Sequence, residues 1–283
     1  MDEKASIDFF SSQVGNVWAD KDIISLLLKR YPKKIAPLLE KIYDVPIKIK
    51  NISAAADNRD EENKNTYNIL VAGVELPERH EDMQQIKHKL TNTKHNIVFD
   101  TINPFGKGKF EHLNAVLNKY NVNNFDWIII TDDDIDVPEN FVDKFIFLAD
   151  FFDLQISQPA HNFVSYATYS VTRRHWNSIA RITNFVEIGP IFMLHRTVFS
   201  EILPFPEVGM GWGLDIYWSL LARERNWRMG IIDALPIRHL RPIGKSYDRH
   251  MALHEAEKLL KKYPMARREE ILRTEKFFRN LRI

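Results

Sequence analysis

A run of bulky apolar residues that leads directly into acidic residues constrains the fold of this chain more than any other feature. Residues 127–130 are all apolar, and Thr131 joins them to the consecutive Asp132, Asp133 and Asp134. A short apolar run of this kind predicts a buried strand. We therefore expect a sheet in which one buried strand carries a cluster of carboxylates at its C-terminal tip.

The spacing of these carboxylates predicts a metal site. In an extended backbone, Asp132, Asp134 and Asp136 point to one side and Asp133 to the other. Carboxylates this close raise one another's pKa unless a cation lies between them. Such a cluster suits Mg²⁺ or Mn²⁺ bound to a diphosphate, at the edge where open α/β sheets place ligands. Helix capping is the competing role, but three consecutive aspartates exceed what a cap needs.

Composition excludes several classes of function. With 283 residues and 45% hydrophobic content, the chain can form one large domain with a substantial core. A net charge of +1 gives no case for nucleic-acid binding, and the absence of cysteine excludes disulfides and thiolate chemistry. The N-terminus lacks the pattern of a signal peptide, and no segment approaches the ~20 apolar residues of a membrane span. We expect a cytoplasmic protein, and composition leaves its oligomeric state open.

The pattern along the chain divides it into four parts. We expect a helical N-terminal module over residues 1–53, a polar linker over 54–66, a domain of alternating strands and helices over 67–250, and a helical tail over 251–283. The alternation predicts parallel pairing in a layered α/β sheet. Strands are expected at residues 67–72, 96–101, 127–131, 154–158, 186–194 and 229–232, with a short end piece at 237–240. Helices before the tail are expected at 78–90, 110–120, 138–152 and 214–224.

The tail is rich in basic residues with apolar residues between them. The segment from Lys258 to Arg282 favours an amphipathic helix packed on the domain. Peripheral contact with an anionic membrane, at its inner face, is the alternative for the same pattern.

Four further residues are candidates for function. Lys107 lies between glycines and forms a pair with Lys109 before a predicted helix, which suits phosphate binding, although a solvated turn has the same composition. Trp212 stands between two glycines and can present an aromatic face to a sugar. Asp215, at a predicted helix start, either caps that helix or acts as a general base towards a substrate hydroxyl. His239 can complete the shell that the aspartates leave short, although an isolated histidine is more often structural.

The order of these residues resembles the glycosyltransferases of the GT-A fold. Residues 132–134 are similar to their Asp-x-Asp element, and residues 106–114 resemble the glycine–lysine and leucine–asparagine helix of the family-two transferases. Residues 211–215 are similar to the Gly-Trp-Gly element of galactosyltransferases, although a single Asp follows it here. The resemblance implies a GT-A-like, Rossmann-like layered mixed sheet with a small helical N-terminal appendage and C-terminal helices.

The resemblance also implies roles for individual residues. It gives a nucleotide-diphosphate sugar as donor, with Trp212 at the sugar, Asp215 as the base and His239 on the metal. The nucleotide contacts that it implies come from Asp100, Lys107, Asn114, Asp132 and Asp133.

A second resemblance covers roughly residues 67–245. This part is similar to a domain-of-unknown-function family labelled as related to lysine-ketoglutarate reductase trans-splicing proteins. The segments that carry it are 156–160, 186–190, 211–215 and 230–234, followed by His239.

These features together predict a metal-dependent, inverting glycosyltransferase in polysaccharide or glycoconjugate synthesis. Asp132, Asp134 and His239 are expected to hold Mn²⁺ or Mg²⁺, and a carbohydrate hydroxyl is the expected acceptor. Gln158 and Glu187 are further candidate contacts to the substrate.

Two other functions stay open. A Mg²⁺-dependent phosphatase of the haloacid-dehalogenase type also has an Asp-x-Asp element after an apolar strand, but that element normally lies near the N-terminus. A module that binds saccharide without turning it over is the non-enzymatic alternative. A calcium-binding loop is excluded because Val137 occupies the place that needs glycine.

Overall fold

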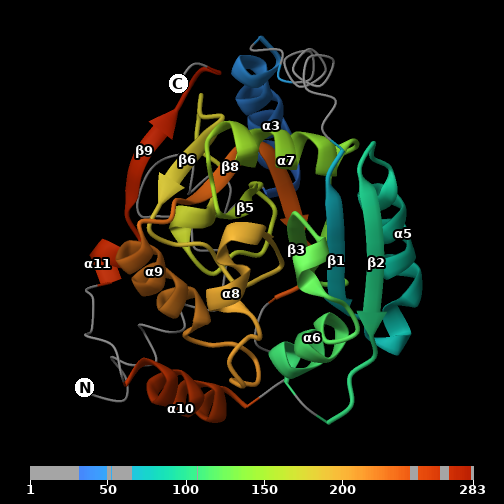
Figure 1. The fold of residues 1–283 in the computed structure, drawn as a ribbon. Coiled ribbons are helices and arrows are strands. Elements are labelled where there is room, and N and C mark those ends of the chain that lie inside the picture. Colours follow the sequence, from blue (N-terminus) through green and yellow to red (C-terminus); the bar gives the residue numbers. More distant parts are fainter. Residues whose placement is uncertain are drawn as a thin grey trace.

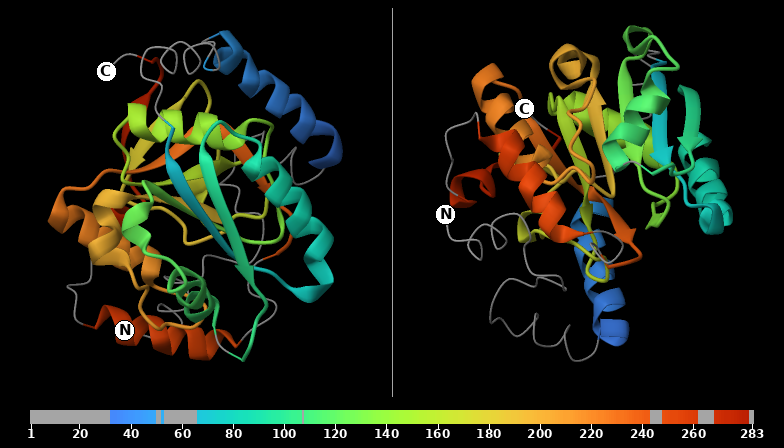
Figure 2. Two further views of the ribbon diagram at one scale, coloured as in Figure 1. Left: turned by 45° about the vertical axis from the view of Figure 1, so that its right-hand side comes forward. Right: turned by 90° about the horizontal axis from the view of Figure 1, so that it is seen from below.

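The structure, a computed structural model, describes residues 32–49, 52, 66–106, 108–242, 248–261 and 268–281. In this part of the chain, nine strands form one mixed sheet with helices on both of its faces (Figures 1 and 2). The strands are β1 (Asn68–Val74), β2 (Asn96–Ile102), β3 (Trp127–Thr131), β4 (Ile135–Asp136), β5 (Ile156–His161), β6 (Ala180–Thr183), β7 (Ile191–His195), β8 (Met229–His239) and β9 (Thr274–Phe278). The helices are α3 (Pro32–Ile49), α5 (His80–Thr91), α6 (Lys109–Leu117), α7 (Phe141–Phe151), α8 (Phe199–Ile202), α9 (Leu214–Arg225), α10 (Arg249–Leu260) and α11 (Arg268–Ile271). The predicted layered α/β sheet is therefore confirmed.

The sheet combines parallel and antiparallel pairs. Its strand order is β2-β1-β3-β7-β5-β8-β6-β9, and β4 pairs with β8 off this path. Strands β1, β2 and β3 run parallel, as the alternation of strands and helices predicts. Strand β7, however, runs antiparallel to both β3 and β5, and β6 runs antiparallel to β8 and β9. Strands β5 and β8 also pair in parallel, so the prediction of parallel pairing holds for β1–β2, β1–β3 and β5–β8 and is wrong for the other pairs along the sheet.

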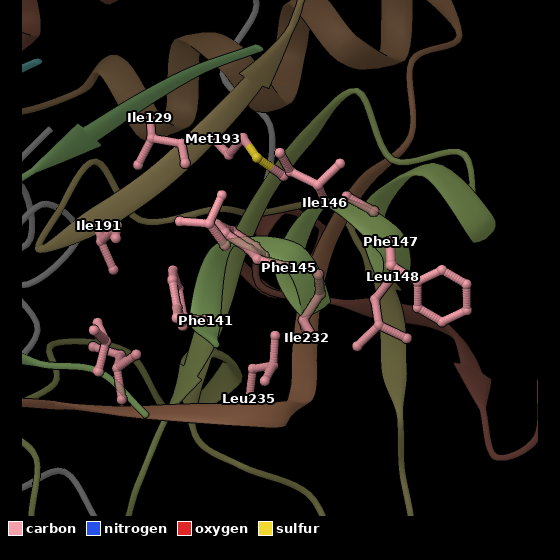
Figure 3. Close-up of a cluster of buried hydrophobic side chains, with 14 of the residues drawn as sticks. Ile129, Phe141, Phe145, Ile146, Phe147, Leu148, Ile191, Met193, Ile232 and Leu235 are labelled. Atoms are coloured by element: carbon pink, nitrogen blue, oxygen red, sulfur yellow. The ribbon is translucent and has the colours of Figure 1, made fainter. Parts of the chain in front are cut away.

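Alternation along the central strands builds a core on each face. Ile129 of β3 packs on the side of α5 and α7, and Ile128 and Ile130 pack on the side of α6 and α9. Figure 3 shows Phe141 and Phe145 of α7 in the first of these cores, where they are fully buried. Because β3 is buried on both faces, its continuous apolar run is the pattern of a central strand.

Two predictions about the C-terminal half were wrong. The tail is not helical throughout, because Thr274–Phe278 forms β9, which pairs with β6 at the sheet edge (Figure 1). Phe278 is buried and stacks on Phe152 at 4.2 Å between ring centroids. The expected pieces at 229–232 and 237–240 are one continuous strand, β8. Both differences depend on pairing with distant strands, which local spacing does not encode.

Helix α3 lies against the rest of the molecule through polar and aromatic contacts (Figure 2). The buried Arg174 donates to Glu40 at 2.7 Å and to Asp44 at 2.6 Å. Tyr43 packs edge-on against Phe163, with 4.8 Å between ring centroids. Most of the expected N-terminal module and the expected linker lies outside the described residues. None of the described helices combines the length and apolarity needed to span a membrane.

Candidate metal centre and its surroundings

Three side chains from two distant segments of the chain meet at one end of the central strands. Asp132 and Asp134 follow β3, and His239 is the last residue of β8. The short strand β4 pairs with β8 so that Ile135 lies opposite His239, and Leu240 donates its backbone N–H to the carbonyl of Asp134. In the described part of the chain, Asp132, Asp134 and His239 form a group whose ligand atoms all lie within 4.8 Å of one another.

The charges of Asp134 and His239 stabilise each other and shift the pKa of both groups. Nε2 of His239 lies 3.2 Å from Oδ2 of Asp134. Burial alone would lower the pKa of His239, but the hydrogen bond to Asp134 and the negative charges of Asp134 and Asp132 raise it overall. Burial would likewise raise the pKa of Asp134, yet the hydrogen bond and positive charge of His239 lower it. A cation in place of the imidazole proton would meet the same carboxylates.

The ring of His239 is oriented by its other nitrogen. Nδ1 lies 3.2 Å from the carbonyl of Tyr166, which can only accept, so Nδ1 carries the proton. The backbone N–H of His239 donates to Oγ of Ser165 at 2.7 Å. This tautomer leaves Nε2, which faces Asp134, as the nitrogen that can bind a metal.

The other two acidic residues of the run lie elsewhere. Asp133 is buried and accepts from Nη1 of Arg79 at 3.0 Å and from the backbone N–H of Leu76 at 2.8 Å. Burial raises the pKa of Asp133 in spite of these two donors. Asp136 is exposed on β4 and pairs with Lys89 at 2.8 Å. The backbone after Thr131 bends instead of staying extended. The prediction that Asp133 points away from Asp132 and Asp134 is correct, but the prediction that Asp136 lies on their side is wrong.

The second lysine of the glycine–lysine segment, Lys109, contacts the metal group. Lys107 lies outside the described residues, but Lys109, the first residue of α6, places Nζ 2.5 Å from Oδ1 of Asp132. Its ammonium also lies 3.4 Å from the carbonyl of Ile188. The signal was present in the sequence, because Lys109 belongs to the same glycine–lysine segment that predicted phosphate binding.

A glycine gives these two side chains their space. A Cβ atom on Gly189 would lie 3.2 Å from both Oδ2 of Asp132 and Nζ of Lys109. The following residue, Pro190, accepts a hydrogen bond from the backbone N–H of Asp132 at 2.8 Å through its carbonyl. The segment before β7 therefore forms a wall of the site that has no side chain of its own at this point.

Gln158 and Glu187 belong to a buried polar network. Oε1 of Gln158 accepts from the backbone N–H of Glu187, and Oε2 of Glu187 lies 3.3 Å from Nε2 of His161. Nδ1 of His161 lies 2.7 Å from Oγ of Ser165, the hydroxyl that also accepts from the His239 backbone. Burial lowers the pKa of His161, which favours its neutral form. Sequence reasoning missed His161, the last residue of β5, because no recognisable motif or spacing connects it with Glu187.

Asp215 is a buried carboxyl in the first turn of α9. Its Oδ1 accepts from the backbone N–H of Ile216 at 2.9 Å. Burial, aided by the nearby negative charge of Glu187, raises the pKa of Asp215 to about 7. Trp212, just before α9, is half-buried and packs on an apolar cluster that includes Leu260 of α10. The predicted base thus has a pKa at which it can gain or lose a proton near neutrality.

Two predicted nucleotide contacts are engaged within the protein. Asp100 pairs with Lys119 at 2.9 Å and accepts from the hydroxyl of Tyr120 at 2.9 Å. The amide of Asn114 donates to the carbonyl of Phe205 at 2.8 Å and accepts from its backbone N–H at 2.9 Å. Asn114 therefore joins α6 to the loop before residue 209, and the structure gives it this structural role.

Three solved structures show distant similarity to this chain. No family model and no curated protein matches the chain. A crystal structure of GalNAc-T7 with UDP, GalNAc and Mn²⁺ aligns over 69% of this chain at 9% identity, with a TM-score of 0.48, and the aligned part covers 48% of that chain. A crystal structure of S. aureus TarS 1-349 in complex with UDP-GlcNAc aligns over 69% of this chain and 65% of that chain at 12% identity, with a TM-score of 0.47.

A third similar structure is the crystal structure of A197 from STIV. It aligns over 62% of this chain and 86% of that chain at 13% identity, with a TM-score of 0.39. The chain thus spans about half the length of GalNAc-T7, the first of these structures. At such identities and scores these similarities assign no family and no activity to this protein.

Proposed function

We propose that this chain is a GT-A-like glycosyltransferase that depends on a divalent metal and moves a sugar from a nucleotide-diphosphate donor to a hydroxyl of a carbohydrate acceptor. The observation that carries the proposal is the meeting of Asp132, Asp134 and His239, which come from two distant segments, within 4.8 Å. Two carboxylates and an imidazole leave several metal positions open for diphosphate oxygens. The imidazole favours Mn²⁺ over Mg²⁺, because Mg²⁺ takes oxygen ligands almost exclusively.

In this proposal the metal, Asp215 and Trp212 have separate roles in the transfer. When bound, the metal neutralises the charge that grows on the leaving diphosphate. In this proposal Asp215 accepts the proton of the acceptor hydroxyl, for which its pKa of about 7 is suitable. Deprotonation of the acceptor for direct attack on the sugar inverts the anomeric centre. The exposed part of Trp212 stacks on the sugar.

The proposal is tested by metal binding and turnover in two variants. Asp134→Ala and His239→Ala are expected to weaken Mn²⁺ binding, measured by calorimetry, and to abolish transfer from a panel of nucleotide sugars. Asp136→Ala is the matched control, because Asp136 belongs to the same acidic run but is exposed and pairs with Lys89. Full Mn²⁺ affinity and full turnover in both site variants would contradict the proposal.

The same assays separate the alternative functions. Hydrolysis of an aryl phosphate without transfer of sugar would favour the phosphatase. Saccharide binding that is independent of Mn²⁺ and unaffected by Asp134→Ala would favour a module that only binds.

A further inference from the structure

The contact between Lys109 and Asp132 places a positive charge of the protein against a ligand of the proposed metal. Nζ of Lys109 lies 2.5 Å from Oδ1 of Asp132, and the side chains are only 15% and 25% exposed. An ion pair this short and partly buried is weakly screened by salt. Resting on the proposed function, we infer that Lys109 competes with the metal for Asp132 and that a diphosphate relieves this competition.

The two halves of the metal group differ in how they are held. Asp134 is positioned by His239 at 3.2 Å and lies 3.7 Å from the buried guanidinium of Arg79. Asp132 is held by the ammonium of Lys109, a charge that a dication must repel or displace. A metal that binds Asp134 and His239 displaces only the proton between them, whereas Asp132 becomes a ligand only after Lys109 moves away.

The surroundings of Lys109 permit this movement. Its ammonium already lies 3.4 Å from the carbonyl of Ile188, a second acceptor next to its present one. Gly189 places no side chain between Lys109 and Asp132, since a Cβ there would lie 3.2 Å from both. The flexible stem of lysine allows its charge to swing while the backbone of α6 stays in place.

Displacement of Lys109 couples the metal to its anion. An ammonium that loses its carboxylate partner needs another negative group, and a diphosphate bound to the metal supplies one. Metal and diphosphate then bind with positive coupling, because each makes the other's binding less costly. The metal alone binds weakly, and the site fills when the donor arrives.

The inference is tested by removing the ammonium and measuring binding with two probes. MnCl₂ alone and the preformed manganese–pyrophosphate complex are each titrated calorimetrically into wild type, Lys109→Gln and Lys109→Met. Loss of the competing charge is expected to tighten binding of Mn²⁺ alone about tenfold. The same loss is expected to weaken binding of the manganese–pyrophosphate complex, so the two effects have opposite signs.

Lys89→Gln is the matched control for a general charge effect. Lys89 also pairs with an aspartate of the acidic run, Asp136, at 2.8 Å, but this pair lies outside the metal group. The Lys89→Gln variant is expected to bind both probes with the affinities of wild type. If the Lys109 variants match Lys89→Gln, or shift both affinities in one direction, the inference is overturned and the proposed function stands. If wild type binds neither probe, both fail together.

Discussion

Asp215 is a carboxyl group that the fold keeps out of water. Its side chain lies in the first turn of α9, is buried, and receives one hydrogen bond from the neighbouring backbone. Burial raises its pKa to about 7, so folding favours the protonated form. A catalytic base needs the opposite form, and activity and stability therefore make conflicting demands on this residue.

Removing the charge of Asp215 should reveal this conflict. Asp215→Asn is expected to lower kcat by about 10²- to 10⁴-fold, the usual contribution of a general base. At pH 8 the same variant is expected to unfold at higher urea concentration than wild type. In wild type the unfolded chain loses this proton at its ordinary pKa and the folded chain only near 7, so stability falls as pH rises between these values. Below pH 4 the two proteins should be equally stable.

The charge of Glu187 should set the pH dependence of the reaction. Because Asp215 acts when deprotonated, kcat/KM is expected to rise with pH and to level off above about 7. The negative charge of Glu187 contributes to the raised pKa of Asp215. Glu187→Gln should therefore shift the rise of kcat/KM, the acidic limb of the profile, to lower pH. A profile that stays unchanged in Glu187→Gln would show that the limb belongs to another group.

The metal site also depends on how two elements cross. The backbones of the start of α6 and of the loop that precedes α9 lie in direct contact, since a Cβ on Gly108 would lie 2.1 Å from Cα of Gly209. The backbone N–H of Gly209 donates to Oε1 of Glu111 at 2.9 Å, and Phe110 donates its own N–H to the Gly209 carbonyl at 3.2 Å. This crossing positions Lys109 at one end and the start of α9 at the other.

A methyl group added at Gly108 should push the start of α6 away from the loop that precedes α9. Gly108→Ala is expected to cost about 3 kcal/mol of unfolding free energy, because backbone cannot yield as a side chain can. Gly106→Ala is the comparison: its φ of +67° strains alanine, but nothing lies within 4 Å of the added Cβ. That strain alone should cost about 1 kcal/mol in the same urea titration. Equal losses in the two variants would argue against the close crossing.

At the scale of the whole molecule, one buried ion pair joins the C-terminal strands. Arg181 of β6 donates to Asp233 of β8 at 2.8 Å, and neither side chain is exposed. The same guanidinium donates to the backbone carbonyls of Val171 and Arg173. Strand β6 lies between β8 and β9, so this pair holds the edge of the sheet to which the tail adds.

Breaking this pair should destabilise the protein far more than breaking an exposed one. Asp233→Asn leaves a buried guanidinium without its counter-charge, and a loss of about 3–5 kcal/mol is expected. Glu201→Gln removes the partner of Arg225, a pair whose side chains are 37% and 40% exposed, and should cost at most about 1 kcal/mol. Both losses are measured by urea unfolding, and equal losses would contradict a supporting role for Arg181.

Local pattern was sufficient for part of the fold and of the site. The bounds of β3 agree with the strand predicted at 127–131, because burial on both faces favours a continuous apolar run. The placement of Asp132 and Asp134 at one site and the start of α9 at Leu214 also follow from residue type and spacing. These features depend on side chains within a few residues of one another.

The tertiary structure decided which distant residues meet. The pairing of β4 with β8 brings His239 to Asp134, and the entry of α6 brings Lys109 to Asp132. Tertiary contacts also pair Asp133 with Arg79 and bond the Asn114 amide to the backbone of Phe205. Residues 274–278 form a strand because they pair with β6. Hydrophobic periodicity specifies which face of an element is buried, but not which other element covers it. That choice depends on long-range packing and pairing energies, so only the folded molecule contains it.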